Sequence, residues 1–128
     1  MVSSGSYIIQ SVSLQKDARL ATNNLNTPVE LVDSSGADNE TWIAKSYTDG
    51  TFTIRNKEWA DNAYAGVASV SSGQQVKAVS VDEAKRWKKS GNQIVISGFA
   101  WQATSDGKII LKPVDTADSN QSFNINSA

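Results

Sequence analysis

One motif recurs three times along this chain of 128 residues, and the recurrence limits the possible folds more than any other feature. A hydroxyl residue precedes a large aromatic residue by seven positions in the segments SGADNETW, SVDEAKRW and TADSNQSF, which end at Trp42, Trp87 and Phe123. The offsets between them are 45 and 36 residues. A second pattern, ARLA, AYAG and AWQA, recurs with offsets of 45 and 37 residues. The chain is therefore predicted to repeat one supersecondary unit three times.

Each unit is predicted to hold four short β-strands. Apolar and polar residues alternate over stretches of a few residues, which is typical of half-buried strands, and turn signals such as YTDG, SSGQ and TSDG separate these stretches. No stretch shows sustained helical periodicity. In the first unit the strands are expected near residues 7–12, 18–22, 29–33 and 41–47.

Three units of four strands indicate an all-β fold, the β-trefoil, in which a closed six-stranded barrel is capped by three hairpins. A propeller has a similar repeat length but needs four or more blades, which a chain of this length cannot supply. Residues 1–128 are expected to form a single β-trefoil domain with repeats at about 5–50, 51–92 and 93–128. Barrel closure would also remove the exposed strand edges that promote aggregation.

Composition excludes several kinds of chemistry. The chain contains no Cys and no His, which removes disulfides, Cys/His zinc sites and catalysis by Ser–His or Cys–His pairs. No metal or cofactor is expected. Paired carboxylates such as Asp82 with Glu83 are the one enzymatic alternative. They lie on predicted turns with no sign of a cleft, so the protein is expected not to be an enzyme.

Charge and hydropathy restrict the partners and the location. Twelve Lys plus Arg against 13 Asp plus Glu give a net charge of −1, which argues against nucleic acid because phosphate binding needs a basic surface. No apolar run approaches the length of a membrane span, and no secretory leader is visible. We therefore expect a cytoplasmic protein without membrane insertion, and its oligomeric state is left open.

The tryptophans divide into predicted core and predicted surface residues. Trp42 and Trp87 occupy the repeated slot that Phe123 fills, so they are expected to plug the barrel. Charged neighbours of Trp87 suggest a strand end near solvent, where the rim of the ring would stay wet. Trp59 has no counterpart in the other units and lies in the polar segment KEWADN. It is either a binding ring or a ring folded back onto the barrel wall.

Two further patterns bear on binding. Arg19, Tyr64 and Trp101 share one position of the second repeated pattern. A slot that accepts a cation, a phenol and an indole is expected to lie outside the tight core, where a trefoil can place up to three binding surfaces. Residues 77–89 contain five cations interrupted by two carboxylates. Such a mixed run predicts a solvated face, with an anionic ligand as the alternative.

Three segments resemble the ricin-B-like β-trefoil lectins of mushroom fruiting bodies: SGSYIIQSV, ETWIAKSYTDGTFTIRN and NQSFNIN. Within that family the chain is most similar to small lectins that recognise fucosylated N-glycan cores, and the similarity runs over nearly the whole chain. The family's Q-x-W signature reads ETW, KRW and QSF here. Only the third unit keeps the Gln, so galactose pockets of the ricin type are not expected.

The resemblance implies a non-catalytic lectin with a defensive role, whose partners are glycans or glycoconjugates. The glycan would be held on the second unit by aromatic rings at Tyr64 and Trp87, with the preceding loop, including Asp82 and Lys85, as the wall. Where the relatives have a further aromatic residue this chain has Lys85, and Trp59 is the candidate to supply the missing ring.

A pyranose presents a C–H face and a rim of hydroxyls, so it also needs hydrogen-bonding groups beside the ring, such as Asn62 and Gln75. The alternative function is a proteinase inhibitor, because mushroom β-trefoils with similar SGxY openings include such inhibitors. Its candidate loops are residues 23–28 and 57–62. Nothing in the sequence singles out a third class, a trefoil that serves as an interaction module.

Overall fold

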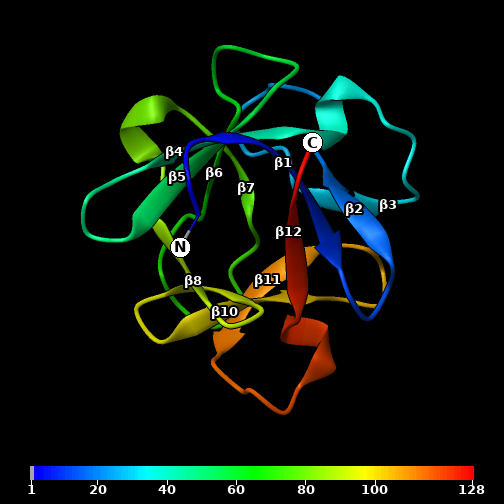
Figure 1. The fold of residues 1–128 in the computed structure, drawn as a ribbon, viewed down its shortest axis with the longest axis vertical. Helices are drawn as coiled ribbons and strands as arrows, with labels where there is room; N and C mark the ends of the chain where they lie inside the picture. The colour runs from blue at the N-terminus through cyan, green and yellow to red at the C-terminus, as the bar shows by residue number, and fades with distance from the viewer. Residues whose placement is uncertain (1) are drawn as a thin grey trace.

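The computed structural model describes residues 2–128, which form twelve β-strands and three short 3₁₀ helices (Figure 1). The first unit comprises β1 (Gly5–Ser11), β2 (Lys16–Arg19), β3 (Glu30–Val32), η1 (Asp38–Glu40) and β4 (Trp42–Ser46). The second comprises β5 (Thr51–Asn56), β6 (Tyr64–Gly66), β7 (Lys77–Val79), η2 (Val81–Glu83) and β8 (Trp87–Ser90). The third comprises β9 (Gln93–Ile96), β10 (Phe99–Ala103), β11 (Ile109–Pro113), η3 (Ser119–Gln121) and β12 (Phe123–Ser127). Within this range no segment is α-helical, so the prediction of an all-β chain is confirmed.

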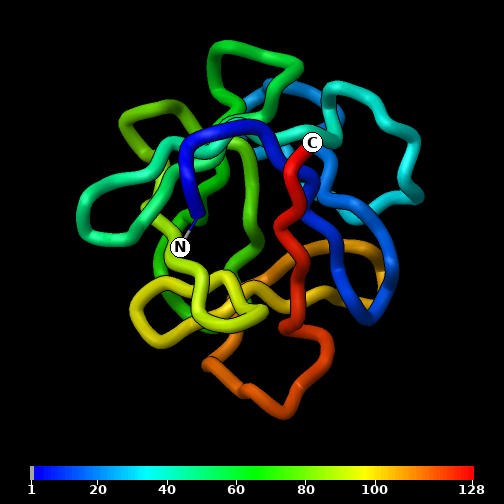
Figure 2. Tube along the Cα trace, viewed as in Figure 1, coloured from blue at the N-terminus to red at the C-terminus, as the bar shows by residue number. Residues whose placement is uncertain are grey.

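Six strands follow the path of the predicted barrel. Antiparallel ladders join β12 to β1, β1 to β4, β4 to β5, β5 to β8 and β8 to β9. Figure 2 shows β1, in blue, and β12, in red, side by side. Between β9 and β12 the link is a single backbone bond, in which the Phe123 N–H donates to the carbonyl of Asn92 at 2.8 Å. Five of the six seams are therefore ladders, and full closure stays a prediction.

The other six strands pair into three hairpins, β2–β3, β6–β7 and β10–β11. Each hairpin touches the other two through an isolated bridge between residues of different units. The bridges join Pro28 to Lys77, Gln75 to Ile110, and Glu30 to Lys108. This cyclic set of contacts is what a threefold arrangement of units requires.

The hairpin registers correct the predicted alignment of the second repeated pattern. Backbone N–H groups that reach the neighbouring hairpin identify three equivalent positions, at Leu31, Ala78 and Leu111. Across their hairpins these residues pair with Ala18, Ala65 and Trp101. Trp101 thus shares a position with two alanines, whereas Arg19 shares its position with Gly66, and Tyr64 lies two residues before Gly66. The assignment of Arg19, Tyr64 and Trp101 to one slot is therefore wrong. The expectation that this slot lies outside the core is also wrong for Trp101, which is fully buried.

Large rings fill the interior. Trp42, Trp87 and Phe123 are each no more than 1% exposed. The indole N–H of Trp42 donates to the carbonyl of Ala18 at 3.0 Å, and that of Trp87 donates to the carbonyl of Ala65 at 3.4 Å. Trp101 makes edge-to-face contacts with Trp87 and Phe123, with ring centroids 5.3 and 5.8 Å apart. The repeated aromatic slot is therefore buried in all three units.

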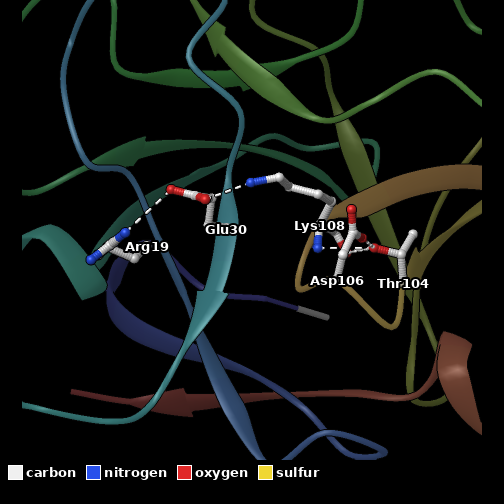
Figure 3. Close-up of polar contacts among 5 residues, drawn as sticks. All are labelled: Arg19, Glu30, Thr104, Asp106 and Lys108. Atoms are coloured by element: carbon white, nitrogen blue, oxygen red, sulfur yellow. Dashed lines mark hydrogen bonds and ion pairs between the residues drawn. The ribbon is translucent and has the colours of Figure 1, made fainter.

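Glu30 ties the hairpin of the first unit to that of the third (Figure 3). Its carboxylate lies 2.5 Å from Lys108 Nζ and 3.2 Å from Arg19 Nη2. Lys108 is held in turn by its backbone N–H, which donates to Thr104 Oγ1 at 3.0 Å. The hydrogen bond from Lys108 lowers the pKa of Glu30 and outweighs partial burial, which raises it, while Arg19 lowers it further.

We predict that Glu30→Gln lowers the free energy of unfolding by about 1 kcal/mol at neutral pH, because it leaves Lys108 and Arg19 without their shared anion. Since the pKa of Glu30 is lower in the folded state than in the unfolded state, this stabilisation is present above the unfolded-state pKa and is lost as the pH falls through the folded-state value. Urea unfolding at neutral and at acidic pH measures both effects. Glu58→Gln, at an exposed carboxylate, is the control. A deficit that persists unchanged in acid would contradict the ion-pair account.

Candidate functional site

The outer face of β4, β5 and β6 carries a hollow of about 450 Å³, which we call the basic hollow. Successive side chains of a strand point to opposite faces. Trp42 and Ala44 therefore point into the core, whereas Ile43 and Lys45 point outward. Cross-strand pairing sets Arg55 beside Ile43 and beside Tyr64. The complete lining is Ile43, Lys45, Tyr47, Thr53, Arg55, Tyr64, Val81, Ala84 and Arg86.

A second hollow of about 500 Å³, which we call the polar hollow, adjoins the first. It is lined by Ala60, Asp61, Asn62, Tyr64, Ser80 and Val81. Tyr64 and Val81 belong to both linings, so the two hollows meet at these side chains. The polar hollow thus combines one aromatic ring with a carboxylate, an amide and a hydroxyl.

Contacts within the protein hold the cations of the basic hollow in place. The Arg86 guanidinium lies 3.7 Å from the centroid of the Tyr47 ring, and Lys45 Nζ lies 5.5 Å from the same centroid. Arg55 Nη1 donates to the carbonyl of Trp59 at 2.6 Å. Cation–π stacking and a backbone acceptor fix these positions without neutralising the charge.

Asp49 is a carboxylate whose pKa is lowered in part by a cation of this hollow. Hydrogen bonds from the side chain and backbone of Thr51 are the main causes that lower its pKa, and the positive charge of Arg86 contributes less. Both bonds end on Asp49 Oδ1, at 2.5 Å from Thr51 Oγ1 and 3.0 Å from Thr51 N. The carboxylate is therefore bound to Thr51 rather than paired with Arg86.

Of the five residues predicted for the glycan site, the structure places only Tyr64 in these hollows. Trp87 is 0% exposed, which corrects the prediction of a wet rim and leaves no ring face for a sugar. Asp82 is exposed on η2 but lines neither hollow. Lys85 is half-buried, with its backbone N–H directed to the carbonyl of Ala65 at 3.4 Å.

Trp59 follows the second of its two predicted arrangements. Its ring is half-buried and packs against the core, and it lines neither hollow. The two polar residues predicted to bond the sugar, Asn62 and Gln75, lie in different places. Asn62 lines the polar hollow, whereas Gln75 lies at the bridge to Ile110 among the hairpins.

The sequence interpretation did not identify Lys45, Tyr47 and Arg55, although a signal for them existed, whereas Arg86 lies in the run 77–89 for which an anionic ligand was the alternative. Alternation along IAKSY and TFTIR assigns Lys45, Tyr47 and Arg55 to the face opposite the buried rings. Their convergence depends on strand pairing, which no local pattern reveals.

Gly66 allows the Val79 side chain of β7 and the end of η2 to pack close to β6, and η2 supplies Val81 to both hollows. A Cβ atom at this position would lie 2.6 Å from Val79 Cγ2 and 3.3 Å from the Glu83 carbonyl. Hairpin register puts Gly66 at the position that Arg19 occupies in the first unit. Only the second unit therefore requires the small residue for close approach.

Across residues 2–128, no three His, Cys, Asp or Glu side chains are grouped as a metal site would need. None of the helices in the same range is both long and apolar enough to span a bilayer.

No family model matches the chain, and no curated protein matches it. Solved structures do. A ricin B-like lectin from Macrolepiota procera, in complex with lactose, has a TM-score of 0.82 at 14% identity over 100% of this chain and 99% of that chain. The Rhizoctonia solani agglutinin has a TM-score of 0.82 at 19% identity over 100% and 98%. The designed threefold-symmetric protein ThreeFoil has a TM-score of 0.81 at 20% identity over 97% and 99%. These likenesses confirm the β-trefoil fold.

We predict that Gly66→Ala destabilises the protein by about 1–3 kcal/mol, the usual cost of overpacking a tight contact. Chemical denaturation measures the change. The control is Gly73→Ala: a Cβ there meets no atom within 4 Å, although its positive φ of 88° adds backbone strain. Wild-type stability in Gly66→Ala would contradict the close packing of Val79 and Glu83 against Gly66.

We predict that Trp59 is the tryptophan most accessible to an aqueous quencher, since Trp42, Trp87 and Trp101 are at most 1% exposed. The Stern–Volmer constant for acrylamide should fall several-fold in Trp59→Phe and change little in Trp87→Phe. A larger fall in Trp87→Phe would show that the Trp87 ring reaches solvent.

Proposed function

We propose that this protein binds carbohydrate without catalysis, and that the sugar lies in the polar hollow against Tyr64. The observation that carries the proposal is the position of this half-buried ring beside Asp61, Asn62 and Ser80. An aromatic face suits the C–H side of a pyranose, and carboxylate, amide and hydroxyl groups bond its hydroxyls. No other ring in the predicted site is placed to do this.

Structural likeness supports the proposal without deciding it. Two of the similar structures are a lectin and an agglutinin, and the lectin holds lactose. One fold hosts many functions, so the site must carry the argument. The proteinase-inhibitor alternative is not favoured, because two of the similar structures are a lectin and an agglutinin. Residues 60–62 of its second candidate loop line the polar hollow beside Tyr64.

The finer parts of the proposal follow the family resemblance. They are a site on the second unit, a fucosylated N-glycan core as the first ligand to test, and a defensive role. A cytoplasmic location is proposed separately. An open hollow gains little free energy per contact, so single-site affinity should be modest. Useful strength would then come from several sites on one chain or from association of chains.

We predict that Tyr64→Ala weakens glycan binding about ten-fold or more, because the stacking face is lost, whereas Tyr64→Phe, which keeps the ring, retains most of the affinity. A glycan array identifies the ligand, and calorimetry on that ligand measures the affinity. Val114→Ala, at an exposed apolar residue of the third unit, is the control. Equal binding by wild type and a folded Tyr64→Ala protein would place the site elsewhere, and no glycan signal at all would reject the lectin function.

A further inference from the structure

We propose that the basic hollow binds an acidic substituent, a carboxylate or a sulfate group, on the same saccharide whose neutral part lies in the polar hollow. The inference rests on the proposed carbohydrate-binding function and adds the chemical class of the ligand.

The charge of the lining is the first argument. Three cations, Lys45, Arg55 and Arg86, line the basic hollow, and no carboxylate does. The ion pairs formed within residues 2–128 use other cations, namely Lys16, Arg19, Lys57 and Lys108. The positive charge of the hollow is therefore not compensated by an ion pair of the protein's own.

The arrangement of donors is the second argument. Arg86 is stacked on Tyr47 at 3.7 Å, and Arg55 uses Nη1 on the carbonyls of Trp59 and Asn56. Each guanidinium keeps further N–H groups for a ligand. A guanidinium presents its N–H groups in a planar fork that matches two oxygens of a carboxylate or sulfate. Side chains already fixed by their own contacts lose less entropy when the anion arrives.

Nearby acidic residues do not fill the hollow. Asp49 is bonded to Thr51, and Asp82 and Glu83 are exposed on η2 outside the lining. The whole chain carries a net charge of −1. A preference for an acidic glycan would therefore come from this hollow and not from a general attraction of anions to the protein.

The shared wall is the third argument. Tyr64 and Val81 line both hollows, so a sugar against Tyr64 lies next to the cations. A volume of about 450 Å³ is within the usual range for small-molecule sites, roughly 300–1,000 Å³. One acidic monosaccharide unit or a sulfated ring position fits this description.

Matched pairs of array glycans test the inference: each neutral glycan is compared with its sulfated form and with its sialylated form, at low and at high ionic strength. We expect the wild-type protein to bind at least one acidic form about ten-fold more tightly than the neutral parent, and the preference to shrink with salt. The double variant Lys45→Gln/Arg86→Gln should lose the preference and keep the neutral affinity. The control, Lys88→Gln/Lys112→Gln, removes the same charge outside the hollow and should keep the preference.

Three results overturn the inference in distinguishable ways. Equal binding of neutral and acidic partners by wild type rejects the acidic subsite and leaves the carbohydrate function standing. Loss of the preference in the control as well as in the double variant assigns it to overall charge. Absence of binding to every glycan rejects the inference together with the proposed function. The sulfated and sialylated arms show which acidic group is accepted.

Discussion

The structure depends on three buried rings, Trp42, Trp87 and Phe123, which begin the last strand of each unit. Burial of each side chain contributes roughly 1.5–3 kcal/mol. The two indoles also donate to carbonyls of the neighbouring hairpins, so they fix the hairpins relative to the barrel. With the inward positions of β4 and β5 committed to this core, the alternate positions are free to carry polar side chains. The surface proposed for the ligand is the outer side of the same strands.

Much of the fold could be predicted from the sequence, because a threefold recurrence of a large aromatic residue leaves few architectures. Register could not. Small residues in ARLA, AYAG and AWQA match by identity but not by position, and only hydrogen bonds between hairpins show that Ala18, Ala65 and Trp101 are equivalent. Three residues, 84–86, separate η2 from its ring, where the first and third units have one. The spacing from hairpin to ring also differs, since Trp42 follows Ala18 by 24 residues and Trp87 follows Ala65 by 22, so the offset between the rings does not apply to the hairpins.

Of the two rings predicted to hold the glycan, Trp87 is buried and Tyr64 is half-buried beside a hollow, and the choice of the second unit stays a prediction. Charged neighbours do not place the Trp87 ring in solvent, because adjacent residues in a strand face opposite ways. The exposed cations Arg86 and Lys88 therefore indicate an inward Trp87. Tyr64 was predicted for the site from the family resemblance, since the repeat position assigned to it was wrong. Lys45 and Arg55 were not, since they come from separate strands and meet only through cross-strand pairing. Local sequence patterns predict which residues form a strand, but they do not predict which strands pair with one another.

The exchange at Trp101 limits how far the three units are interchangeable. In the first two units a small residue, Ala18 or Ala65, accepts the indole N–H of a tryptophan, whereas the third unit places the indole on β10 and a phenyl ring at Phe123. The third unit therefore has buried rings on two strands, Trp101 on β10 and Phe123 on β12. The backbone is nearly symmetric but the filling is not. A chain assembled from three copies of the second unit would lack the Trp101 indole and would need a redesigned interior. A change in the size of a buried side chain in one unit must be compensated by a side chain that packs against it.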